Sequence, residues 1–110
     1  MADEYLQVIT TTATEEEAGR LARSIVEARL AACVQVLGPI TSTFWWRGNI
    51  DTTPEWLCLM KTTSAHFDEL VAHLKAHHSY EVPEVTAIPI RRGSDDYLAW
   101  ISEETRGSRS

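Results

Sequence analysis

The segment "ITSTFWWRGNI", residues 40–50, decides which architecture the rest of the chain has to complete. Residues 40–46 have the β-branched and aromatic composition of a strand, and Gly48-Asn49 fits a two-residue hairpin loop of type II′. The return strand is expected over 50–62, with Pro54 at a bulge or an edge. Because typical strands have about five or six residues, part of this hairpin should project from the domain. The projecting part is expected to carry four aromatic residues, Phe44, Trp45, Trp46 and Trp56.

Upstream of the hairpin, the pattern predicts a strand, a helix and a second strand. "YLQVITTT" (5–12) and "AACVQVL" (31–37) are the strands, and Gly38-Pro39 separates the second from the hairpin. Between them, Thr14 and Glu17 fit a capping box. The carboxylates at 15–17 are therefore assigned to the positive end of the helix dipole rather than to catalysis. The helix has one apolar stripe, formed by Ala18, Leu21, Ala22, Ile25 and Val26.

Downstream of the hairpin, the pattern predicts a helix, a strand and a last helix. Ser64 is expected to cap a helix over 65–77, 85–90 reads as an edge strand, and 94–101 as a short helix before a frayed tail, 106–110. The order β-α-β-β-α-β with a terminal helix is the α+β, ferredoxin-like sandwich pattern, in one domain spanning 1–110. Right-handed crossovers place both main helices on one sheet face, with the first and third strands central.

Composition and charge limit the classes of partner. The 110 residues are 44% hydrophobic and 24% charged, with a formal net charge of -6, which disfavours nucleic acid and an acidic membrane surface as partners. No run approaches the ~20 apolar residues of a membrane helix. The acidic opening "MADEY" has no signal-peptide core, which predicts a cytoplasmic protein. Cys33 and Cys58 lie in apolar runs and are interpreted as buried structural thiols.

The hairpin aromatics also predict self-association. Trp45 and Trp46 are adjacent in a strand and should face opposite sides, one packing on the core and the other on a neighbouring chain. An uncovered sheet face, open strand edges and an exposed aromatic patch are all typical of a protein interface. We therefore expect an oligomer rather than a monomer.

Five segments resemble, in order, those of the CutA family of divalent-cation-tolerance proteins over about Val8 to Thr105. The segments are "TTTATEEEAGRLARSIVEARLAACVQV", "STFWWRGNI", "LMKTT", "HHSYEVPEV" and "GSDDYLAWI". The resemblance implies a ferredoxin-like protomer in a tight cytosolic homotrimer whose long hairpins pair with neighbouring subunits. It also implies a role in copper and divalent-metal tolerance. The likeness of this family to trimeric PII signalling proteins suggests the alternative, a small molecule bound in an intersubunit cleft.

Two positions depart from the family pattern. Ser79 replaces a common proline, which leaves His78 freer in backbone conformation. Some bacterial relatives carry a cysteine at the position of Thr10, and that cysteine forms their copper site with the two histidines that match His77 and His78. The neutral hydroxyl of Thr10 cannot replace a soft thiolate as a copper(I) ligand.

The segment "AHHSYEVPEV", residues 76–85, holds the residues predicted to bind a ligand. At a helix end the chain can bend, so His77 and His78 could reach one ion in a weak site that prefers copper(II), nickel or zinc. His66, His73 and His77 share one helix stripe, which is either a metal-binding face or a solvated flank.

The remaining polar residues of this segment have two readings. Tyr80, Glu81 and Glu84 either line a cleft between subunits or fix the loop through backbone and arginine contacts. Lys61 and Tyr97 are expected as neighbours of such a cleft. No catalytic constellation is readable, so we expect no enzyme; an unknown reaction using Glu81, Glu84, Lys61 and Tyr97 is the third hypothesis.

Overall fold

The computed structural model describes residues 4–107 and has the predicted order of elements. A short 3-10 turn at Ser64–His66 precedes the second helix. In chain order the elements are β1 (Tyr5–Thr12), α1 (Glu15–Glu27), β2 (Cys33–Trp46), β3 (Asn49–Thr63), α2 (Phe67–His77), β4 (Thr86–Ile90) and α3 (Asp95–Thr105).

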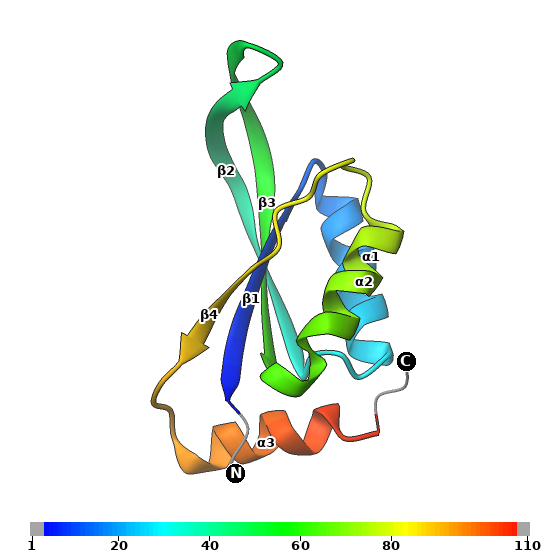
Figure 1. Ribbon diagram of the computed structural model, residues 1–110, viewed down its shortest axis with the longest axis vertical. Coiled ribbons are helices and arrows are strands. Elements are labelled where there is room, and N and C mark those ends of the chain that lie inside the picture. Colours follow the sequence, from blue (N-terminus) through cyan, green and yellow to red (C-terminus); the bar gives the residue numbers. More distant parts are fainter. Residues whose placement is uncertain (1–3, 108–110) are drawn as a thin grey trace.

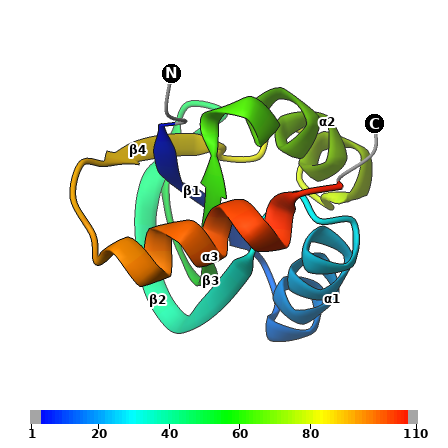
Figure 2. The same ribbon diagram turned by 90° about the horizontal axis from the view of Figure 1, so that it is seen from below.

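The four strands form one antiparallel sheet in the order β2-β3-β1-β4, with the first and third strands central as predicted. Helices α1 and α2 lie side by side on one face of this sheet, and α3 crosses its end opposite the hairpin tip (Figures 1 and 2). A hydrogen bond of 2.7 Å between Tyr5 Oη and Ser102 Oγ joins α3 to β1. The ferredoxin-like α+β prediction is confirmed.

The hairpin loop differs from the predicted one. Trp46 pairs with Asn49, so the two loop residues are Arg47 and Gly48, with φ of 50° and 83°. Positive φ at both positions is the type I′ geometry, whose twist matches that of the strands, rather than type II′. The prediction was wrong because an arginine in the left-handed region is costly. Here the guanidinium lies 5.3 Å from the centre of the Trp46 ring, a cation–π contact that favours this conformation.

The position of Trp56 also differs from the expectation. The pairing of β2 with β3 shifts between Leu37 and Ile40, on either side of Gly38. A Cβ atom at Gly38 would lie 2.5 Å from Trp56 Cδ1, so the indole packs directly over the glycine. Trp56 is half-buried against the core. The other three aromatics lie at the end of β2 next to the hairpin loop, and this hairpin projects from the domain (Figure 1).

One of the two predicted helix caps is present in the structure and the other is not. Thr14 Oγ1 accepts a hydrogen bond of 3.1 Å from the Glu17 N–H, as predicted for the start of α1. Ser64 is not the cap of α2, because it begins the 3-10 turn that precedes the first α-helical residue, Phe67. Thr63 Oγ1 is instead hydrogen-bonded to His66 Nδ1 over 2.7 Å within that turn.

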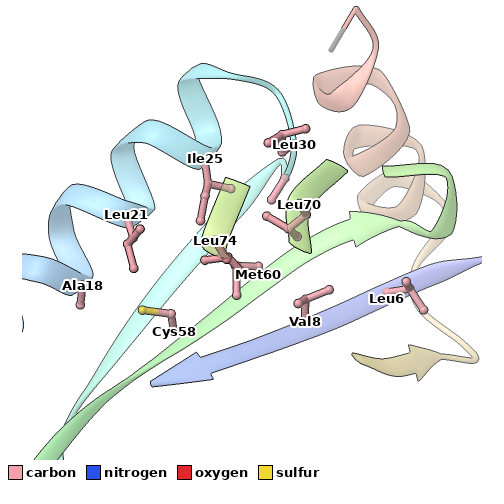
Figure 3. Packing of buried hydrophobic residues seen from close by; sticks show 11 residues of the cluster. Leu6, Val8, Ala18, Leu21, Ile25, Leu30, Cys58, Met60, Leu70 and Leu74 are labelled. Atoms are coloured by element: carbon pink, nitrogen blue, oxygen red, sulfur yellow. The ribbon is translucent and has the colours of Figure 1, made fainter. Parts of the chain in front are cut away.

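The core lies between the sheet and the two helices (Figure 3). Cys58 is buried in it, as predicted, but Cys33 at the start of β2 is only half-buried. In residues 4–107 no helix combines the length and apolar character needed to cross a membrane. The central members of the core are Val8, Ala18, Leu21, Ile25, Met60, Leu70 and Leu74.

Candidate functional site

Helix α2 ends between the two adjacent histidines, as the sequence predicted. His77 is the last helical residue, and His78 has extended backbone angles of φ -85° and ψ 143°. The His78 N–H still donates to the Leu74 carbonyl over 2.9 Å. This change of backbone conformation gives the two imidazoles different surroundings, because His77 is exposed and the His78 side chain is fully buried.

Both ring nitrogens of His78 are hydrogen-bonded. Nε2 lies 2.8 Å from the Thr11 carbonyl, which can only accept, so Nε2 carries the proton. Nδ1 accepts from the Tyr80 N–H over 3.0 Å. Thr10 Oγ1 lies 3.3 Å from Nε2, which places the residue at the family cysteine position beside His78. For His78 to bind a metal ion, at least one of these bonds must break.

Glu17 is a site residue that the sequence analysis missed. Its carboxylate is nearly buried and accepts two hydrogen bonds of 2.8 Å from Ser79, one from the N–H and one from the hydroxyl. It also lies 3.6 Å from His78 Nδ1. The sequence analysis assigned the Glu17 side chain to the capping box. In the structure only the Glu17 N–H takes part in the cap, by donating to Thr14 Oγ1, and the side chain contacts Ser79 instead. Glu17 therefore anchors the segment that follows α2.

His73, which is half-buried, and His77, which is exposed, form a second histidine pair on α2. Their rings are stacked, with centroids 4.3 Å apart and planes at 28°. His73 Nε2 lies 2.9 Å from Ser24 Oγ of α1, and His77 Nδ1 lies 2.8 Å from the His73 carbonyl. Burial, followed by the neighbouring His77, lowers the pKa of His73. His66 belongs instead to the preceding turn, where it contacts Thr63.

A groove of about 790 Å³ separates the projecting hairpin from the segment after α2. Tyr80, Glu81 and Glu84 all line it. The predicted cleft between subunits stays a prediction, because this groove is formed by one chain. The hairpin contributes Phe44 and Trp46. Its other lining residues are Thr11, Ala13, Ser42, Thr43, Asp51, Thr53, Glu55, Ser79 and Val82, and no lysine, arginine or histidine is among them.

Glu55 is the second residue that the sequence analysis missed. It is a buried carboxylate of β3 that accepts a hydrogen bond of 2.6 Å from Tyr80 Oη. Burial, that hydrogen bond and the charges of Glu55 and Glu17 raise the pKa of Tyr80. The sequence did hold a signal for this residue, because Glu55 lies within the apolar run "PEWLCLM". A glutamate in such a run is expected to be buried, and a buried carboxylate needs a hydrogen-bond or charge partner.

Lys61 and Tyr97 do not line this groove; the prediction that they lie beside a cleft between subunits stays a prediction. Lys61 pairs with Cys33 across β2 and β3, and its Nζ donates to Gln35 Oε1 over 2.6 Å. Burial, and then the nearby Cys33 thiol, raise the pKa of Tyr97. These two residues therefore belong to the α3 end of the sheet, apart from Tyr80 and Glu81.

The donor set decides which metals this region fits. In residues 4–107 no group of three or more histidine, cysteine or carboxylate side chains is arranged to hold an ion. Thr10 offers no thiolate beside His78, so the corner does not fit copper(I) as it stands. The half-buried imidazole of His73 and the exposed one of His77 instead fit divalent ions that accept nitrogen donors.

Cys58 is expected to be inert in the folded protein. Burial, and then the Glu17 charge, raise its pKa to about 11. The reactive thiolate is therefore scarce at pH 8. In a Cys33→Ser variant, a disulfide reagent should modify Cys58 only after denaturation. Rapid labelling of that variant in the native state would contradict the burial of the thiol.

Comparisons with known proteins agree with the fold. Residues 6–104 match the family model described as CutA1 divalent ion tolerance protein. The chain is 45% identical over 102 residues to protein CutA 1, chloroplastic, of Oryza sativa, which covers 92% of this chain and 58% of that protein. It is 43% identical over 98 residues to divalent-cation tolerance protein CutA of Thermus thermophilus; the match covers 89% of this chain and 95% of that protein.

Solved structures show the same similarity in three dimensions. CutA1 from Oryza sativa has a TM-score of 0.92 at 42% identity, with 96% of both chains covered. The periplasmic divalent cation tolerance protein CutA from Archaeoglobus fulgidus has a TM-score of 0.90 at 41% identity, with 93% and 99% covered. The chain spans only 58% and 55% of the length of the rice and Arabidopsis thaliana relatives.

Proposed function

Because the chain belongs to the CutA1 family of divalent ion tolerance proteins, we propose that it is a homotrimer that binds copper(II) or a related divalent metal ion. The family match, which spans nearly the whole chain, carries this proposal. The protein would bind the ion through imidazole groups near the C-terminal end of α2, where His77, one of the two predicted ligands, is exposed. The proposal includes no catalytic step.

The donor chemistry of α2 supports the metal. The Nδ1 of His77 donates to a carbonyl oxygen, which leaves the Nε2 lone pair of this exposed ring available. Imidazole favours copper(II), nickel and zinc over calcium and magnesium, which prefer oxygen ligands. The adjoining groove adds negative potential through Asp51, Glu55, Glu81 and Glu84.

The hairpin supports the assembly. Trp45 is 71% exposed and its cross-strand partner Ile50 is 63% exposed, while Phe44 and Trp46 are exposed along the groove. Neither tryptophan packs on the core of its own chain, although one of them was expected to do so. Apolar side chains exposed on both faces of a hairpin are typical of a protein interface, which supports the proposal that neighbouring subunits cover both faces.

The wild-type protein tests both parts of the proposal. At micromolar concentration, sedimentation equilibrium should give three times the chain mass of 12.4 kDa. Calorimetric titration at pH 7.5 should show binding of Cu²⁺, Ni²⁺ or Zn²⁺ and none of Mg²⁺ or Ca²⁺. A monomer mass would contradict the assembly, and a lack of heat with all three transition metals would contradict the metal function.

A second function, a PII-like signalling trimer, is favoured by the groove itself. Three aromatic rings and four carboxylates line about 790 Å³ without a basic side chain, which suits a cationic molecule better than a nucleotide. A thermal-shift screen of amines and nucleotides distinguishes these classes, because only a bound molecule raises the melting temperature. Stabilisation by amines without any metal binding would favour signalling.

The cytoplasm remains the proposed location. The relatives' names include chloroplastic and periplasmic proteins, so the family occurs in several compartments. Fractionation of cells that express the tagged chain tests this point, and recovery outside the cytoplasm would refute it.

A further inference from the structure

Helix α2 carries an imidazole pair that the family comparison does not assign. His73 and His77 are four residues apart, and their rings are already in contact, with centroids 4.3 Å apart. Side chains at this spacing lie on the same helix face, about 5–6 Å apart at Cβ. Glu69 lies one further turn along the same line, at the same spacing from His73.

The hydrogen bonds of the pair determine which nitrogens are available. Ser24 Oγ donates to the Leu21 carbonyl over 3.1 Å, so it accepts from His73 Nε2–H. His77 Nδ1 must donate, because its partner is the carbonyl oxygen of His73. This assignment leaves one lone pair on each ring, on Nδ1 of His73 and on Nε2 of His77, without a hydrogen-bond partner among residues 4–107.

His78 is a poorer partner for His77. Its Nε2–H donates to Thr11 and its Nδ1 accepts from Tyr80, so both nitrogens are already used. The ring is also buried, whereas His77 points to solvent. Binding through His78 would break a buried hydrogen bond and leave a polar group unpaired, which opposes binding.

We propose that His73 and His77 chelate a divalent cation that prefers nitrogen ligands, namely Cu²⁺, Ni²⁺ or Zn²⁺, at an i,i+4 site on α2. The inference rests on the proposed divalent-metal function and names the ligand pair. Rotation of the two side chains would bring their lone pairs to one ion, with water completing the coordination. The rotation gives up the contacts to Ser24 and to the His73 carbonyl, but it moves an exposed and a half-buried ring rather than a fully buried one. The site needs no second subunit, because α2 lies beside the sheet, apart from the projecting hairpin (Figure 1).

Calorimetric titration with Ni²⁺ tests the ligand pair in the full-length protein at pH 7.5. His73→Gln and His77→Gln should each lower the affinity at least about tenfold, as the loss of one of two ligands requires. His66→Gln is the matched control and should leave the affinity within about threefold. Wild-type affinity in the His73→Gln variant would overturn the inference.

A second measurement on the wild type removes any dependence on folding of the variants. Substoichiometric Cu²⁺ should broaden the imidazole NMR signals of His73 and His77 before those of His66 and His78. Earlier broadening of His78 would refute the His73–His77 pair but leave divalent-metal binding intact. The absence of binding by Ni²⁺, Cu²⁺ and Zn²⁺ would refute the inference and the proposed function together.

Discussion

The double replacement of Trp45 and Trp46 by alanine is expected to yield monomers instead of the proposed wild-type trimer. Trp45 and Trp46 are 71% and 47% exposed in the single chain and lie on opposite faces of the hairpin. Truncating a tryptophan at the centre of an interface costs about 2 kcal/mol or more. Two such losses at every proposed subunit interface should raise the dissociation constant of the assembly into the micromolar range. Sedimentation equilibrium can measure dissociation constants in that range.

Two control variants distinguish lost contact area from a damaged hairpin. The double replacement by phenylalanine keeps most of the aromatic surface and should remain trimeric. Thr52→Ala removes only a hydroxyl contact of 3.1 Å to Thr43 in the same hairpin, and it should also remain trimeric. If the double alanine variant still sediments with the wild-type mass, the hairpin aromatics do not hold the subunits together.

The second large effect is expected at Glu17. Glu17→Ala should lower the free energy of unfolding by about 2–4 kcal/mol, because it leaves the Ser79 N–H and hydroxyl without their acceptor and opens a small cavity. Glu17→Gln should cost less. Its amide oxygen can still accept from the N–H, and its amide nitrogen can donate to the hydroxyl. Urea unfolding, with protein concentration held constant, measures both variants.

Glu16→Ala is the matched control for Glu17. Glu16 occupies the same helix turn but is exposed, and its replacement should change the free energy of unfolding by no more than about 0.5 kcal/mol. A similar, small loss in both variants would show that Glu17 acts only through the helix dipole. The assignment of Glu17 as the anchor of Ser79 would then be wrong.

The sequence by itself determined the elements and their order, because those signals are local. The i, i+3, i+4 stripe behind Thr14 predicted α1, and the β-branched runs predicted the strands. Crossover handedness then predicted that β1 and β3 are central. The end of α2 at His77 was also readable, since "HHSYEVPE" loses the helical period.

Only the tertiary structure decided which side chains meet. Glu17 contacts Ser79 across 62 positions of sequence, and Tyr80 contacts Glu55 across 25, so neither pair leaves a periodic trace. The strand registers place Lys61 opposite Cys33, at one end of the sheet, while Glu81 lines the groove beside the hairpin. A backbone change at one residue separates His78 from His77, and the helix instead stacks His77 on His73. Such contacts follow from register and burial of the whole chain, which short-range patterns do not encode.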